Sequence, residues 1–223
     1  PTRIGIEGLP DGVGQLPAHV PVSLVAADAP SAALWFPALL EDALAAGPVG
    51  LVASDTSWVD GLLRRPALQA AYRVGRLQLW VLSPGLQAEV RRHGLLPLME
   101  ELERTGLSDA HALFVCDAQG LLAGLSVVEL ARVSRQLSAL CRERARPVVL
   151  GFFPPLEPEV LLPALRNLCQ MSMHIATLRT DADRWSLGLE RWNTDGGALF
   201  QTAFGLLHDD TTGRLMADGT RTR

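Results

Sequence analysis

The stretch VSLVAADAPSAALWF, residues 22–36, joins an apolar run to a helical pattern through a short turn. Val22–Ala27 is apolar at every position but one, which predicts a strand covered on both faces. Residues 31–46 then repeat apolar side chains at helical spacing around the acidic pair Glu41 and Asp42. A buried strand that leads directly into a helix is the first half of a βα unit.

Four more apolar runs of this kind follow along the chain, and helical patterns separate them. The segment 126–144 is the clearest helix, because Ser126 and Glu129 have the spacing of a capping box. Helical spacing also covers 87–104 and 159–169. Strands that alternate with helices predict right-handed βαβ crossovers and a mainly parallel sheet. The further strand runs are Gly50–Ser54, Leu77–Leu82, Ala112–Cys116 and Pro147–Phe153.

The pattern changes after Gln170, where three strand-like runs are joined by turns rich in Asp, Asn and Gly. Such turns predict hairpins, and hence an antiparallel β-meander near the C-terminal end. The last segment is polar, and we expect a frayed tail over 209–223 after a domain that spans 1–208. The three runs are Met173–Leu178, Trp185–Trp192 and Ala198–Leu207.

Length and composition limit the class of protein. A chain of 223 residues with 48% hydrophobic and 20% charged residues is typical of one globular domain with a full core. The formal net charge of −4 gives no basic surface for nucleic acid. No apolar stretch approaches the roughly 18 residues of a membrane span, and we expect a cytoplasmic location. The chain begins with neither Met nor a signal peptide, so we expect a piece of a longer polypeptide.

A parallel sheet followed by an antiparallel meander resembles the RecA and KaiC branch of P-loop ATPases. The resemblance implies a phosphate-binding loop after the first strand, and such a loop needs glycines, a lysine and a Ser or Thr. The segment 27–33 has no glycine, Pro30 removes an amide donor, and the whole chain contains no lysine. We therefore predict a RecA-like three-layer α/β sandwich with a degenerate P-loop and without ATP hydrolysis.

Asp117 ends the apolar run Ala112–Cys116, as the acidic residue of a Walker B element does. In this interpretation Asp117 belongs to a degenerate magnesium site; in the alternative it is a turn residue at a strand end. The five histidines are scattered and the three cysteines lack zinc-site spacing, so we predict no metal, no cofactor and no catalytic residue. The cysteines are expected to be small core residues: Cys116, Cys141 and Cys169.

Aromatic and arginine side chains are the candidates for a protein-binding surface. Trp185 and Trp192 lie seven residues apart on a predicted strand, so they point to opposite faces and one should be exposed. Trp35 and Phe36 are adjacent near a helix start, where burial of both is difficult. Core packing is the alternative for these aromatics, and a solvated face is the alternative for two arginines on the 126–144 helix. The candidate interface residues are Trp35, Phe36, Trp185, Trp192, Arg132 and Arg135.

Six stretches, spread over nearly the whole chain, carry a further resemblance. They are RIGIE at 3–7, VSLVAAD at 22–28, ALFVCD at 112–117, the helix at 130–141, RPVVL at 146–150 and the meander from ATLR at 176–179 to RWSLGLERWN at 184–193. By the pattern and spacing of these stretches, the chain resembles the N-terminal domain of the BcsE family of bacterial cellulose-secretion regulators. The missing lysine and glycine-rich loop agree with this resemblance.

This resemblance implies a degenerate RecA-like module without ATPase activity. It implies a scaffold for protein contacts that bring the protein from the cytoplasm to the inner-membrane cellulose synthase complex, including a small membrane subunit. Self-association is also implied. The family's cyclic di-GMP site lies in a later domain, so no residue of this chain is assigned to it.

Two other functions fit the same residues. An accessory or inhibitor protein of DNA repair or cell division, such as the SulA or ImuA groups, would bind RecA-like or filament partners. A nucleotide sensor would bind ATP through Asp117 and arginine side chains without hydrolysing it. Filament-assembly assays and calorimetry with Mg-ATP separate these functions from a cellulose-secretion scaffold.

Overall fold

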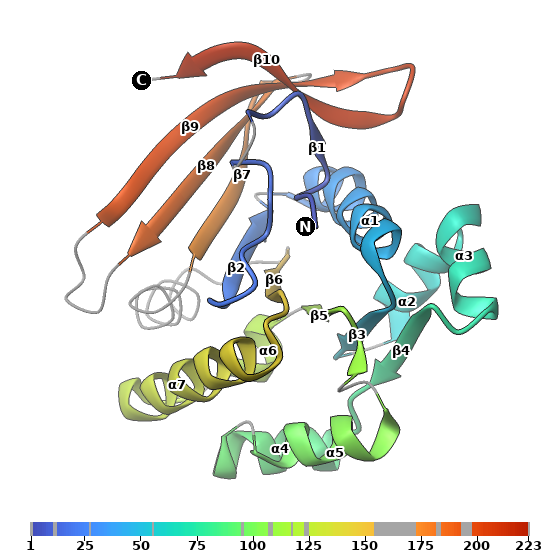
Figure 1. Cartoon of the computed structure of the whole chain (residues 1–223), viewed down its shortest axis with the longest axis vertical. Coiled ribbons are helices and arrows are strands. Elements are labelled where there is room, and N and C mark those ends of the chain that lie inside the picture. The colour runs from blue at the N-terminus through green and yellow to red at the C-terminus, as the bar shows by residue number, and fades with distance from the viewer. Residues whose placement is uncertain are drawn as a thin grey trace.

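The structure is a computed structural model that describes residues 2–10, 13–26, 28–54, 56–94, 96–106, 109–116, 118–122, 125–153, 173–181, 184–192 and 198–222. These residues form a ten-stranded sheet with helices on both of its faces (Figure 1). The strands are β1 (Ile6–Glu7), β2 (Val22–Ala26), β3 (Val49–Ala53), β4 (Leu77–Val81), β5 (Ala112–Cys116), β6 (Val148–Phe152), β7 (Met173–Asp181), β8 (Arg184–Trp192), β9 (Ala198–Asp209) and β10 (Arg214–Thr222). The helices are α1 (Ala29–Ala46), α2 (Thr56–Leu63), α3 (Pro66–Arg73), α4 (Pro84–His93), α5 (Leu96–Thr105), α6 (Ala118–Leu122) and α7 (Val127–Arg144).

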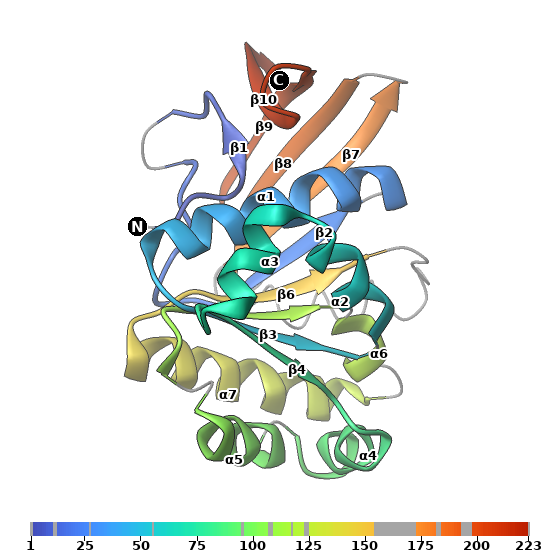
Figure 2. The same ribbon diagram turned by 90° about the vertical axis from the view of Figure 1, so that its right-hand side faces the viewer.

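The six neighbouring strands β7-β2-β6-β5-β3-β4 pair in parallel, which confirms the mainly parallel sheet. The five apolar runs predicted to be strands are strands, and their ends agree to within one residue. They are apolar throughout because both faces are covered. On β5, Phe114 and Cys116 lie in the core beneath α1, whereas Leu113 and Val115 lie in the core beneath α7. The predicted three layers are thus confirmed, with α1, α2 and α3 on one face and α4 to α7 on the other (Figure 2).

The start of α7 has the predicted capping box. The Ser126 backbone N–H donates to Glu129 Oε2 at 2.6 Å, and the Glu129 N–H donates to Ser126 Oγ at 3.4 Å. The hydrogen bond from the Ser126 backbone holds the pKa of Glu129 below its ordinary value. The spacing of these two residues in the sequence was therefore enough to locate the first turn of the helix.

The single helix predicted over 87–104 is wrong. α4 ends at His93 and α5 begins at Leu96. Gly94 closes α4 with a φ of 75°, a left-handed backbone conformation that does not continue a helix. The predicted helix over 159–169 lies outside the described residues.

The C-terminal strands β7, β8, β9 and β10 form the predicted antiparallel meander and extend it. The frayed tail expected over 209–223 is wrong for most of its length. β10 pairs antiparallel with β9, and it also pairs in parallel with β1 at Leu215 and Met216, where its backbone is paired on both sides. Leu215 of β10 is buried in the core, although most of the strand is polar.

Charged hydrogen bonds join the N-terminal segment, α1 and β10. Arg214 Nη2 donates to Asp42 Oδ1 at 2.7 Å and to the Ala38 carbonyl at 3.2 Å. The other carboxylate oxygen of Asp42 accepts the Gly5 N–H at 3.1 Å. We call Gly5, Asp42 and Arg214 the clasp. The Arg214 and Asp42 side chains are only 20% and 16% exposed, so solvent screens their interaction weakly.

Asp42→Asn is expected to lower the free energy of unfolding by about 2 kcal/mol, because it weakens two charge-assisted hydrogen bonds and leaves Arg214 with Glu7, 3.5 Å away and more exposed, as its carboxylate partner. Urea denaturation measures this loss. Glu41→Gln is the matched control, since Glu41 pairs with Arg65 at 3.3 Å in a more exposed position. Its loss should stay below about 1 kcal/mol. Equal losses for the two variants would contradict the role given to the clasp.

Candidate functional site

The turn between β2 and α1 lies where the sequence resemblance implies a phosphate-binding loop. β2 is flanked by β6 and β7, and α1 begins at Ala29, three residues after β2 ends at Ala26. In open parallel sheets, ligands bind outside the carboxyl ends of the strands. The N-terminus of a helix at this position presents amide donors that suit an anion.

Asp28 supplies the anion at this helix end. Its Oδ1 accepts the Ser31 N–H at 2.7 Å and the Ser31 hydroxyl at 2.6 Å. Asp28 has an extended backbone, and its carbonyl accepts the Ala32 N–H at 3.1 Å, as expected for an N-cap residue. A phosphate at the start of α1 would compete with this carboxylate for the same amide and would be repelled by its charge. Asp28 followed by Pro30 is a helix-start signal that is visible in the sequence.

Trp185 connects this helix end to the meander. Its indole Nε1 donates to Ser31 Oγ at 2.9 Å, and its side chain is 5% exposed. The Ser31 hydroxyl therefore lies between the Asp28 carboxylate and the Trp185 ring. The prediction that Trp185 belongs to an exposed interface is wrong, because the ring fills the space between β8 and α1.

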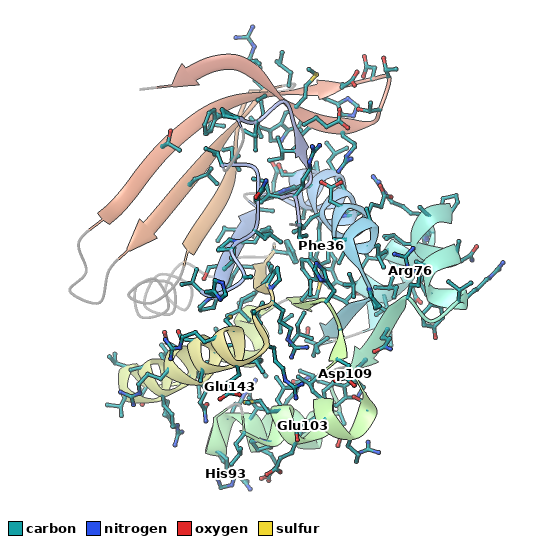
Figure 3. The ribbon with its side chains drawn as sticks, in the orientation of Figure 1. Phe36, Arg76, His93, Glu103, Asp109 and Glu143 are labelled. Carbon is teal, nitrogen blue, oxygen red and sulfur yellow. The ribbon has the colours of Figure 1, made fainter. Side chains whose placement is uncertain are left out.

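Phe36 belongs to a cluster of aromatic rings at the carboxyl ends of the parallel strands (Figure 3). Its ring centroid lies 4.9 Å from that of Phe153 and 6.1 Å from that of Phe114. The ring of Trp58, at the start of α2, lies 4.6 Å from Phe153 and closes the cluster. Phe36 is 1% exposed, so its predicted place in an exposed interface is also wrong.

Trp35 is fully buried, and its indole Nε1 donates to the Ile4 carbonyl at 2.7 Å. Both members of the adjacent pair Trp35 and Phe36 are buried because α1 contacts the sheet, α2 and the N-terminal segment on different sides. The interface prediction is therefore wrong for Trp35 as well. An amphipathic pattern does not reveal a helix that is covered on more than one side.

The remaining candidates are not brought to the end of α1. Arg132 is half-buried and Arg135 is exposed on α7, on the opposite face of the sheet from α1. Asp117 and the side chain of Trp192 lie outside the described residues. Within those residues, no group of His, Cys, Asp and Glu could hold a metal ion. Cys116 and Cys141 are buried as predicted, and burial raises the pKa of Cys141 to about 11, while Cys169 is outside the described part.

A groove of about 270 Å³ lies between α1 and α2, beside the aromatic cluster. Small residues of α1 form one wall, and Trp58 and Arg65 lie on the other. Arg65 is held by Glu41, so its guanidinium is directed along α1.

Among the helices that the structure describes, none is both long and apolar enough to cross a membrane.

The layers, the strand order and the helix that follows β2 define a RecA-like α/β protein. The fold is similar to that of the flagellar accessory protein FlaH from Methanocaldococcus jannaschii, with a TM-score of 0.54 at 12% identity over 86% of this chain and 87% of that one. No curated protein sequence matches the chain.

Residues 1–216 match the sequence profile of the family described as cellulose biosynthesis protein BcsE, N-terminal domain. The chain belongs to this family, and its role lies in the regulation of cellulose biosynthesis.

Proposed function

We propose that this chain is a non-catalytic scaffold domain that binds protein partners of the inner-membrane cellulose synthase complex. It is recruited from the cytoplasm to the membrane by such contacts, including one with a small membrane subunit. It also associates with further copies of itself. It takes part in a pathway controlled by cyclic di-GMP without holding that nucleotide in its own residues.

The observation that carries this proposal is the carboxylate of Asp28 at the N-terminus of α1. A RecA-like ATPase uses this helix end for phosphate, and its lysine for the charge that develops during hydrolysis. Here the helix end is capped internally, and the chain has no lysine. A RecA-like domain whose phosphate site is closed acts through the surfaces that it presents to other proteins.

The experiment is an affinity capture from native membranes, with this chain as bait and mass spectrometry as the readout. FlaH serves as the control bait, since it has a similar fold and comes from a different context. We expect cellulose synthase subunits with this chain and not with FlaH. Recovery of DNA-repair or cell-division proteins without synthase subunits would contradict the proposal.

Nucleotide binding is tested separately. Calorimetric titration with Mg-ATP at millimolar concentration is expected to give only heats of dilution. The Asp28 carboxylate repels the phosphates, and the chain has no lysine to bind them. Heat that saturates with one equivalent of ATP would favour the nucleotide-sensor alternative. Hydrolysis above background would exclude a non-catalytic domain altogether.

A further inference from the structure

β4 is the last strand of the sheet on the side away from the meander. It has β3 as its one neighbour among the described strands, and no other strand runs along its outer side in either view (Figures 1 and 2). The other end of the sheet is β1, which is two residues long. A very short edge strand offers little backbone for pairing. Beyond β1, the outer side of β10 is interrupted by a register shift between Ala217 and Arg221 and carries charged residues. β4 is therefore the regular, uncharged free edge of the described sheet.

The pairing with β3 fixes which backbone groups of β4 point outward. The Arg76 carbonyl accepts the Val49 N–H at 2.8 Å, and the Leu82 N–H donates to the Ala53 carbonyl at 2.9 Å. In a parallel pair, alternate residues of a strand bond to the same neighbour. Positions 76, 78, 80 and 82 thus bond to β3, and the N–H and C=O groups of positions 77, 79 and 81 face away from it.

This edge lacks the devices that usually protect an edge strand. The sequence LQLWV at 77–81 has no charged residue and no proline, and its register with β3 is continuous without a bulge. Leu79 and Trp80 are half-buried, and Val81 is 36% exposed. An uncharged, regular edge with accessible apolar side chains is a template for a further strand.

The surroundings of β4 select the charge of that strand. Residues 61–88 contain four arginines and no Asp or Glu, in a chain whose net charge is −4. Arg64 and Arg73 are exposed and make no ion pair within the described part of the chain. Arg76, at the entry to β4, is also exposed and donates to the Leu44 carbonyl (Figure 3). An acidic partner is complementary to this surface, whereas a second copy would bring the same arginines together.

We propose that the outer edge of β4 binds an extended, acidic segment of a partner protein, which adds to the sheet as a strand beside β4. Backbone groups of positions 77, 79 and 81 bond to the segment, and Arg64, Arg73 and Arg76 attract its carboxylates. This binding mode rests on the proposed function, because it supplies one of the partner contacts of the scaffold.

The probe is the fluorescent peptide EVTVEVTE, and the matched control is KVTVKVTK with the charge reversed. Fluorescence anisotropy is expected to show saturable binding of the acidic peptide alone, weakening as salt is raised. Amide hydrogen exchange measured by NMR should slow at Leu79 and Val81 when the peptide is present. Equal binding of both peptides, or no binding at millimolar peptide, would overturn the proposal.

Two substitutions at one position separate strand addition from general attraction. Val81→Pro removes an outward N–H without removing a bond to β3, and is expected to weaken peptide binding about tenfold. Val81→Thr keeps the N–H and should change binding less than about twofold. The urea midpoint of each variant verifies that the fold is kept. Binding that is unaffected by Val81→Pro in a folded protein would place the peptide elsewhere and refute the proposal.

The arginines are tested by the double variant Arg64→Glu and Arg73→Glu, which should abolish binding of EVTVEVTE. Two other occupants of the β4 edge, a second copy of the chain and an anionic membrane surface, would each give a different result. A dimer of the chain that Val81→Pro converts to monomer, or binding to anionic vesicles that Val81→Pro leaves intact, would contradict an acidic peptide at this edge. Peptide binding that persists while membrane capture recovers no synthase subunit would reject the cellulose-synthase scaffold and leave the β4 site standing.

Discussion

Trp35→Ala is expected to lower the free energy of unfolding by about 4 kcal/mol, among the largest losses of any single substitution in this chain. The Trp35 ring is fully buried and packs in the core that α1 shares with the sheet. Its removal leaves a cavity and takes the donor from the Ile4 carbonyl, which then lies buried without this partner. A natural domain has about 5–15 kcal/mol of stability in total, so the variant should approach unfolding at moderate temperature.

Thermal and urea denaturation measure this loss, and Tyr72→Ala is the control. Tyr72 is an aromatic residue on α3 that is 46% exposed, so its replacement should change stability by less than about 0.5 kcal/mol. The two variants also decide between a core and an interface role for Trp35. A folded Trp35→Ala protein of unchanged stability that no longer binds its partners would restore the interface role and contradict the buried position.

The strands of the parallel half of the sheet were predictable because each is determined by residues that are adjacent in the sequence. Strands such as β5 are apolar at every position, since α1 covers one face and α7 the other. The start of α7 was predictable for the same reason, because Ser126 and Glu129 satisfy each other within one turn. The sequence also has no lysine, so no rearrangement of this chain can supply the lysine that a phosphate-binding loop uses.

The remaining features depend on residues that are far apart in the sequence. β10 is polar, and its strand conformation comes from pairing with β9 and β1 and from the bond of Arg214 to Asp42. The burial of Trp185 depends on Ser31, a residue 154 positions earlier in the chain. Aromatic residues were assigned to an interface from their number and spacing alone, and neither property reports which surfaces meet in the fold. Asp28 was the one local signal at the candidate site, since an N-cap residue is visible in the sequence.

Gly5→Ala is expected to cost about 3 kcal/mol of stability, because two unfavourable terms act at this residue. Gly5 has a φ of 78°, a left-handed conformation in which a side chain costs about 1–2 kcal/mol. A methyl group there would also lie 2.6 Å from the Leu39 nitrogen and 2.8 Å from its Cα. These are backbone atoms of α1 and cannot rotate away, so the N-terminal segment must shift and loosen the bond from the Gly5 N–H to Asp42.

Gly75→Ala is the control that separates the two terms in Gly5→Ala. Gly75 has a φ of 73°, but nothing lies within 4 Å of the position that its methyl group would take. Urea denaturation should therefore show a loss of only about 1–2 kcal/mol for this variant, the conformational term alone. The difference between the two losses measures how closely the N-terminal segment is held against α1. Equal losses would mean that the N-terminal segment moves away from α1 without a loss of stability. The clasp would then contribute little to holding β1 and β10 on α1.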